Sequence, residues 1–228
     1  MGGLGNPRVH FRLTDSTNAR ARELAGRGAP HGTVVTASEQ SAGRGRQGRT
    51  WTAPAGRALL CSILIREPPR LLPLAAGAAV AEVVGADALI KWPNDVMVAG
   101  RKVAGILVEG RPADRWAVVG IGLNVALGPE DFPPELRDRA GTLGRDPSEI
   151  EPVLWALLGE VSRWIGAGAD AVLEAVRARD ALLGREIRWA GRIGTGAGID
   201  GDGRLVVATE EGEVRLNAGE VHLEGGGT

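Results

Sequence analysis

Three arginines spaced by glycines give this sequence its clearest candidate for anion binding. The segment Gly43-Arg44-Gly45-Arg46-Gln47-Gly48-Arg49 carries three guanidinium groups in seven residues and no apolar side chain. Each guanidinium presents planar donors to a phosphate or carboxylate, and glycine lets the backbone approach a ligand closely. The spacing is not that of a P-loop. We expect a loop that orders around an anion, and the alternative is a solvated basic loop or an RNA-binding segment.

A second group of polar side chains lies in the turn Lys91-Trp92-Pro93-Asn94-Asp95, which follows a short apolar run. Its cation could bind a triphosphate, and the oxygens of Asn94 and Asp95 are ligands that Mg²⁺ accepts. The alternative is a plain Pro-Asn-Asp turn. Lys102 precedes the apolar run Val103–Val108, where it either reaches solvent or neutralises a buried carboxylate. These are the only lysines among the 27 Lys and Arg residues.

Two further segments could contact a ligand through backbone and amide groups. The segment Gly120-Ile121-Gly122-Leu123-Asn124 ends a predicted strand, so its glycines admit a ligand and its amide can bind a polar group. A glycine pair needed only for packing is the alternative. Asp15-Ser16-Thr17-Asn18 supplies several good helix N-caps. Neither Cys61, which lies in an apolar run, nor the three histidines have the surroundings or spacing of a nucleophilic or metal site.

Short apolar runs predict the strands that position these segments, and longer periodic stretches predict the helices. The expected strands are Val9–Leu13, Thr33–Ala37, Ala58–Ile65, Ala88–Trp92, Val96–Val98, Val103–Val108 and Trp116–Asn124. The expected helices are Ala19–Gly26, Leu71–Gly85, one capped by Ser148, and one from about Asp170 to Leu183. Residues 39–50 are expected to form a loop. Short connections favour antiparallel pairing, because a parallel crossover needs about a dozen residues.

After Gly184 the sequence consists of short apolar runs separated by turns. The runs Glu186–Trp189, Arg192–Ile199, Leu205–Thr209, Val214–Leu216 and Glu220–Leu223 predict short strands joined by glycine-containing turns. We therefore expect an α+β domain at residues 1–183 and a small β-barrel domain at residues 184–228. Residues 127–146 contain no motif that we can interpret.

Composition excludes several other classes of protein. The chain has 228 residues, 43% of them hydrophobic, and a formal charge of −1, which argues against disorder and against bulk binding of a polyanion. No apolar run has the length of a membrane span, and the first residues do not form a signal peptide. With a single cysteine, these features favour a cytoplasmic protein.

The order of the segments strongly resembles that of biotin protein ligases, also called biotin–[acetyl-CoA-carboxylase] ligases. The segments are Asp15–Asn18, Gln40 followed by Gly43–Trp51, Lys91–Asp95, Lys102–Glu109 and Gly120–Asn124. The resemblance runs from about Val9 to Leu223. It implies a catalytic domain similar to that of class II aminoacyl-tRNA synthetases, with a mixed, largely antiparallel sheet and flanking helices. It also implies that the C-terminal barrel is of the Src-homology-3 type.

The implied reaction has two steps. Biotin and Mg-ATP give biotinyl-5′-AMP and pyrophosphate, and a lysine of a biotin carboxyl carrier protein or domain then displaces AMP to form an amide. ATP, Mg²⁺ and biotin are thus the expected ligands. No covalent intermediate with the enzyme is needed.

The resemblance also implies a role for each matching residue. Ser16, Thr17, Asn18 and Gln40 would bind the biotin head group, and Arg44, Gly45 and Arg46 would close over biotin and the phosphates. Arg46, Lys91 and Lys102 would be catalytic: Arg46 at the α-phosphate, Lys91 at the phosphoryl and acyl centre, and Lys102 at the biotin carboxyl group. The remaining nucleotide and metal positions would be Trp51, Asn94, Asn124 and, for magnesium, Asp95. Trp51 would pack against the adenine side or under the loop.

Two rival functions predict features that the sequence lacks. A lipoate ligase or octanoyltransferase should show an Arg-Arg-x-x-Gly-Gly-Gly loop with a nearby His-Asp pair, and an RNA-binding protein should interleave aromatic residues with the arginines. Family members that repress transcription carry a winged helix-turn-helix before the Ser-Thr-Asn segment, whereas 15 residues precede Ser16 here. We therefore expect the form that acts only as a ligase, without DNA or membrane binding. Formation of a homodimer is left open.

Overall fold

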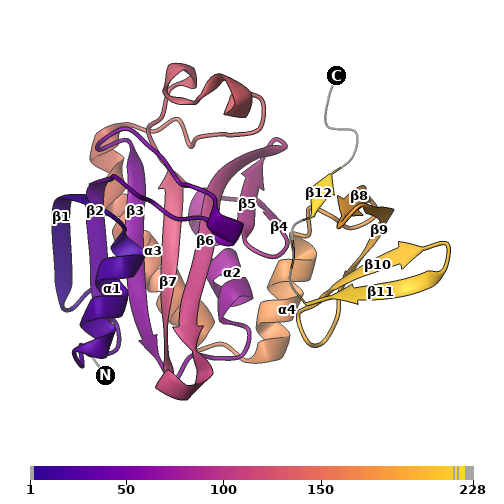
Figure 1. Ribbon diagram of the computed structural model, residues 1–228, viewed down its shortest axis with the longest axis horizontal. Coiled ribbons are helices and arrows are strands. Elements are labelled where there is room, and N and C mark those ends of the chain that lie inside the picture. Colours follow the sequence, from indigo (N-terminus) through magenta and orange to yellow (C-terminus); the bar gives the residue numbers. More distant parts are fainter. Residues whose placement is uncertain (1–2, 218, 220, 224–228) are drawn as a thin grey trace.

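The computed structural model describes residues 3–217, 219 and 221–223. Its larger part is a seven-stranded sheet in the order β1-β2-β3-β7-β6-β5-β4 (Figure 1). The strands are β1 Arg8–Thr14, β2 Val34–Gln40, β3 Ala58–Arg66, β4 Leu89–Lys91, β5 Asp95–Val98, β6 Arg101–Arg111 and β7 Trp116–Asn124. Only β1 and β2 pair in parallel, and all other neighbours are antiparallel. The prediction of a mixed, largely antiparallel sheet is confirmed.

The interior strand β3 is almost entirely apolar because helices cover both of its faces. Cys61, Ile63 and Ile65 belong to the large core cluster that includes residues of α2 (Leu72–Val84) and α3 (Ile150–Ile165). Leu64 instead packs with residues of α1 (Thr17–Gly26) in a separate cluster. In Figure 1, α1 covers one face of the sheet and α3 the other. A strand buried on both sides reads as a continuous apolar run, which is the pattern that predicted it.

Two helix predictions were wrong in detail. The side chain that caps the entrance to α3 is that of Asp146, which accepts a hydrogen bond from the Ser148 backbone nitrogen at 2.9 Å and begins a short 3-10 turn, Pro147–Glu149. Ser148 therefore lies inside the turn. The next helix, α4, spans only Ala169–Ala178. It does not reach Leu183, because Asp180 and Leu183 form bridges with neighbouring strands instead.

The C-terminal part is an antiparallel sheet in the order β11-β10-β9-β8-β12. Its strands are β8 Glu186–Trp189, β9 Arg192–Ile199, β10 Leu205–Thr209, β11 Gly212–Leu216 and β12 His222–Leu223. The predicted start of the last strand, Glu220, lies outside the described residues. Within the described part, β11 and β12 are the two edges of this sheet. The closed barrel of the Src-homology-3 type and the domain boundary at residue 184 stay predictions.

One turn of the C-terminal sheet packs directly on the larger sheet's flank. The indole nitrogen of Trp92 donates to the Gly203 carbonyl at 3.0 Å, and Arg70 pairs with Asp202 at 2.8 Å. Gly203 has a φ of +79°, and a Cβ there would lie 2.8 Å from a methyl carbon of Leu71. The turn therefore requires glycine, and it fixes the C-terminal sheet beside the segment that carries Lys91.

Candidate active site

A cavity of about 870 Å³ lies between the start of α1, the arginine loop and the strands β4 to β7. It is lined by every residue that the sequence predicted for the site, together with several residues of the segment 131–140 and the C-terminal strand β12. The predicted residues are Ser16, Thr17, Asn18, Gln40, Arg44, Gly45, Arg46, Trp51, Lys91, Asn94, Asp95, Lys102 and Asn124. Segments separated by more than a hundred residues therefore meet at one place. Contact of each residue with a ligand stays a prediction.

The start of α1 and the end of β2 form an uncharged, polar end of the cavity. Ser16 is the N-cap of α1, and its hydroxyl accepts a hydrogen bond from the Ala19 backbone nitrogen. Gln40 Oε1 accepts hydrogen bonds from the backbone nitrogen of Thr17 at 2.7 Å and from its hydroxyl at 3.1 Å. These bonds orient the Gln40 amide, so its nitrogen remains directed away from Thr17.

Asn18 is held by a buried network that the sequence did not predict. Its Nδ2 donates to Glu109 Oε2 at 2.8 Å and to the Leu107 carbonyl at 3.2 Å, while Ser62 donates to its Oδ1 at 2.6 Å. A Cβ on Gly120 would overlap the Asn18 amide. Both amide hydrogens of Asn18 are thus engaged within the protein, which leaves only an Oδ1 lone pair for a ligand.

Ser62 and Glu109 are the functional candidates that sequence reasoning missed. Ser62 is fully buried in β3, and the only available signal was a hydroxyl inside a continuous apolar run. Glu109 ends the apolar run of β6, where a charged residue is unremarkable. Only the three-dimensional arrangement places both beside Asn18.

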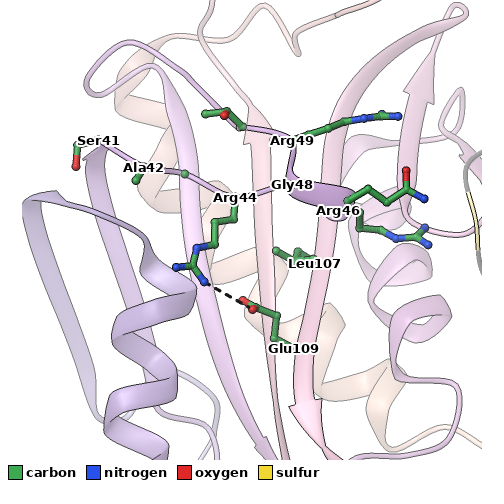
Figure 2. Close-up of a pocket in the computed structure, with 12 residues that line it drawn as sticks. Ser41, Ala42, Arg44, Arg46, Gly48, Arg49, Leu107 and Glu109 are labelled. Atoms are coloured by element: carbon green, nitrogen blue, oxygen red, sulfur yellow. Dashed lines mark ion pairs between the residues drawn. The ribbon is translucent and has the colours of Figure 1, made fainter.

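The arginine loop folds back on itself above the sheet. Gly45 donates to the Arg49 carbonyl at 2.7 Å, and Trp51 donates to the Gly43 carbonyl at 3.0 Å. Arg46–Gly48 form a 3-10 turn in which Gln47 has a φ of 55°. Figure 2 shows Arg44 pointing toward Glu109 and Arg46 pointing away from it. The loop therefore presents its cations in two directions, and its ordering by a ligand stays a prediction.

Arg46 connects the loop to the turn after β4. Its Nη1 donates to Asn94 Oδ1 at 2.9 Å, and Asn94 Nδ2 donates to the Ile106 carbonyl at 3.2 Å. Burial lowers the pKa of Arg46 from its usual 12.5, with the nearby charge of Asp95 opposing the shift. A guanidinium remains protonated despite such a shift. A fixed, partly desolvated positive charge therefore faces the cavity.

Lys91 is the last residue of β4, Lys102 lies near the start of β6, and both line the cavity. Lys102 Nζ lies 2.7 Å from Asp95 Oδ1, so the lysine pairs with a mostly buried carboxylate. Burial lowers the pKa of Lys91 from its usual 10.5, while the charge of Asp95 raises it. Three cations, those of Arg46, Lys91 and Lys102, thus lie near the single carboxylate of Asp95. Such an excess of positive charge suits an anionic ligand.

Trp51 packs under the loop, against two glycines of the sheet. A Cβ on Gly122 would lie 2.5 Å from Trp51 Cε2, and one on Gly105 would lie 3.1 Å from Trp51 Cζ3. Lys102 Nζ is 5.6 Å from the centre of the ring. Gly120 accommodates Asn18, and Gly122 accommodates Trp51. Packing, the alternative considered in the sequence analysis, therefore accounts for the glycine pair of β7.

Asn124 holds the segment that sequence analysis could not interpret. Its Nδ2 donates to the Gly141 carbonyl at 2.8 Å, and its own carbonyl accepts from the Leu143 backbone nitrogen at 2.9 Å. Phe132 and Arg139 of this segment line the cavity. The middle of the segment 127–146 therefore forms one wall of the site, and Asn124 anchors that segment.

None of the helices in the described residues is long and apolar enough to cross a membrane.

The described residues also include no group of three or more His, Cys, Asp or Glu side chains that could hold a metal ion. Asn94 and Asp95 place oxygen atoms in the cavity, but Asp95 is paired with Lys102. Because magnesium commonly takes one or two carboxylates and completes its shell with phosphate oxygens and water, these residues fit a metal that arrives with a nucleotide.

Comparison with known families matches both parts of the chain. Residues 10–125 match the model of the biotin/lipoate A/B protein ligase family, and residues 175–223 match the biotin protein ligase C-terminal domain. The chain is 32% identical over 243 residues to the bifunctional ligase/repressor BirA of Bacillus subtilis, which covers 96% of this chain and 75% of that protein. It is 35% identical over 233 residues to the biotin–[acetyl-CoA-carboxylase] ligase of Mycobacterium tuberculosis, covering 92% and 86%.

The fold agrees with these sequence relationships. The biotin protein ligase from Aquifex aeolicus in complex with biotin and ATP superimposes with a TM-score of 0.79 at 30% identity, over 95% of this chain and 98% of that chain. Fold and site thus define a protein of the biotin- and lipoate-ligase class. The chain belongs to the biotin/lipoate A/B protein ligase family, in its biotin protein ligase branch, and is an enzyme of the ligase class.

Proposed function

We propose that this enzyme activates biotin with ATP as biotinyl-5′-AMP and transfers the biotinyl group to a lysine of a biotin carboxyl carrier protein or domain. One observation carries the proposal: a single cavity joins an uncharged polar end at Thr17 and Gln40 to a cationic end at Arg46, Lys91 and Lys102. Biotin has the matching polarity, with a polar ureido ring at one end and a carboxylate at the other. Relatives that are named or solved as biotin ligases support the same substrate.

In the first step, a biotin carboxylate oxygen attacks the α-phosphorus of ATP. A new P–O bond forms, the bond to the β-phosphate oxygen breaks, and pyrophosphate leaves. The reactants are both anions, so the enzyme must bring them together and neutralise their repulsion. Lys102 is assigned to the carboxylate, Arg46 to the α-phosphate and Lys91 to the reacting centre between them. The contacts of Arg46 with Asn94 and of Lys102 with Asp95 support these assignments, because charges held in place would limit the reorganisation that the reaction requires.

Magnesium would enter this site with the phosphates, where Asn94 and Asp95 can supply oxygen ligands beside Arg46. When bound, the ion would neutralise charge on the phosphate oxygens. Asp95 forms an ion pair with Lys102 in this structure. To coordinate the metal, its carboxylate would have to contact both the ion and Lys102 or give up the ion pair.

In the second step, the ε-amino group of the carrier lysine attacks the acyl carbon of the adenylate. A C–N bond forms, the bond from the acyl carbon to the phosphate oxygen breaks, and AMP leaves while the amine loses a proton. The only cysteine, Cys61, does not take part, because burial raises its pKa to about 12 and places it in the core. Transfer is therefore direct, without an enzyme-bound acyl group.

Exchange of labelled pyrophosphate into ATP tests the first step. We expect exchange that depends on biotin and on Mg²⁺ and that is not supported by lipoate or octanoate. Exchange with lipoate but not with biotin would reject the assignment of substrate. The variant Arg115→Gln, at an exposed ion pair with Glu67, serves as a control for the loss of one arginine.

A further inference from the structure

Glu109 connects the polar end of the cavity with the arginine loop. Its Oε2 accepts a hydrogen bond from Asn18 Nδ2 at 2.8 Å, and its Oε1 accepts one from Arg22 Nη1 at 3.1 Å. The same Oε1 lies 4.0 Å from Arg44 Nη1, and a dashed line marks this ion pair in Figure 2. One carboxylate on β6 therefore contacts helix α1 through two residues and the loop through a third.

The position of this carboxylate is fixed from the α1 side. Asn18 is buried, and Ser62 donates to its Oδ1, which turns its Nδ2 toward Glu109. Asn18 adjoins Thr17, whose backbone and hydroxyl orient Gln40. Glu109 thus belongs to the same network as the side chains assigned to the biotin head group, although it does not itself line the main cavity.

The contact with the loop is the adjustable part of this arrangement. Arg44 is half exposed and lies at the limit of an ion pair, so water screens the attraction in the described state. A ligand in the cavity, together with the loop above it, would exclude some of that water and strengthen the pair. The charge of Glu109, which does not line the main cavity, would therefore favour closure of the loop over a ligand.

We propose that Glu109 is a positioning residue that holds Arg44, and with it the arginine loop, over the biotin end of the cavity. This inference rests on the proposed function. The two arginines of the loop would then have different roles. Arg44 closes the loop through Glu109, and Arg46 is directed to Asn94 and the reacting phosphate. Glu109 should therefore affect how long biotin is retained more than the rate of the chemical step.

The variant Glu109→Gln isolates the charge, because its amide oxygen can still accept from Asn18 while its attraction for Arg44 is lost. We expect labelled biotin to dissociate from the binary complex about three- to fivefold faster, the size expected for a partly exposed ion pair. The KM for biotin should rise by a similar factor, and kcat at saturating biotin should stay within about twofold, since the reacting groups are untouched. An unchanged dissociation rate would overturn the proposal.

A double-mutant cycle separates the ion pair from a general structural effect. If Glu109 acts through Arg44, then Glu109→Gln in an Arg44→Gln background should accelerate dissociation by much less than it does in the wild type. Equal acceleration in both backgrounds would contradict the proposal. Arg115→Gln is the control, because it removes an arginine from an exposed ion pair with Glu67 that does not involve Glu109, and it should leave biotin retention unchanged.

Two further measurements keep the outcome clear. If Glu109→Gln unfolds, Arg44→Lys and Arg44→Gln test the same pair from the exposed loop: lysine should retain most of the wild-type retention time and glutamine should not. Similar retention in both variants would reject the pair. Failure of the proposed function would appear as no biotin binding by the wild-type protein, whereas failure of this inference leaves wild-type binding intact and the Glu109→Gln complex equally long-lived.

Discussion

Substitution of Gly122 by alanine tests whether the sheet beneath the arginine loop controls the site. Gly122 lies in β7 and is paired on both sides, with Leu60 of β3 and Gly105 of β6. Its backbone is therefore held in place. A Cβ at this position would lie 2.5 Å from Cε2 and 2.8 Å from Nε1 of Trp51. Carbon atoms in ordinary contact are about 3.5 Å apart, so the ring must move by roughly 1 Å.

The displacement should reach the arginines because Trp51 is part of the loop's closure. Its backbone nitrogen donates to the Gly43 carbonyl, and the preceding residue, Thr50, forms a bridge with Arg44. Crowding of this kind costs about 1–3 kcal/mol of stability. A misplacement of about 1 Å costs roughly 100-fold in rate when it shifts groups that position a reaction. We therefore expect Gly122→Ala to lose roughly 100-fold in activity at temperatures where the variant is still folded.

The assay is biotin-dependent pyrophosphate exchange, combined with thermal unfolding of each variant. Gly159→Ala in α3 is the control, because a Cβ there meets nothing within 4 Å and a helix gains about 0.5–1 kcal/mol from the change. Its activity should be that of the wild type. Combining Gly122→Ala with Trp51→Phe should recover part of the lost activity, since a smaller ring relieves the overlap. Wild-type exchange by Gly122→Ala, or a combined variant weaker than Gly122→Ala, would refute the reasoning.

Three further predictions concern the cations. Lys102→Arg should lower single-turnover adenylation at least tenfold although it keeps the charge, because Nζ lies 2.7 Å from Asp95 and also against Gly105, where a wider guanidinium does not fit; wild-type kinetics would contradict this. Arg46→Ala should lose about 3 kcal/mol of transition-state stabilisation in kcat/KM, as for removal of one preorganised donor, and an unchanged value would contradict its role at the phosphate. Burial lowers the pKa of Lys91, so its charge is lost as pH rises through a value below 10.5. A pH–rate profile should therefore fall on its alkaline side below pH 10.5, and Lys91→Arg should move that fall to higher pH; identical profiles would exclude Lys91 as its cause.

Much of the sheet could be predicted from sequence because its central strands are buried on both faces. Ala58–Ile65 and Trp116–Asn124 are near-continuous apolar runs, and the structure places them in β3 and β7. Element ends were predicted less well, since they depend on local competition. Asp146 and Ser148 are both good caps, and the structure selects the carboxylate of Asp146. The end of α4 is set by the pairing of Asp180 with Ile90, which lies 90 residues earlier in the chain.

The site was predictable where residue type alone indicates chemistry, and not where a role arises from contact. Arginines between glycines, and the two lysines, point to anion binding from the sequence. Glu109 and Ser62 gave no such signal, because their importance comes from the orientation of Asn18. Residues 127–146 show no motif, and their place in the wall of the cavity depends on Asn124, whose side chain holds Gly141.

The central claim is tested most directly by the mass of an acceptor after reaction. The enzyme is incubated with biotin, Mg-ATP and an isolated biotin carboxyl carrier domain, and the intact carrier is analysed by mass spectrometry. We expect the mass of one biotinyl group to be added, and no addition when the acceptor lysine of the carrier is replaced by arginine or when ATP is omitted. A carrier that remains unmodified with biotin but gains a lipoyl group when lipoate is supplied would contradict the account.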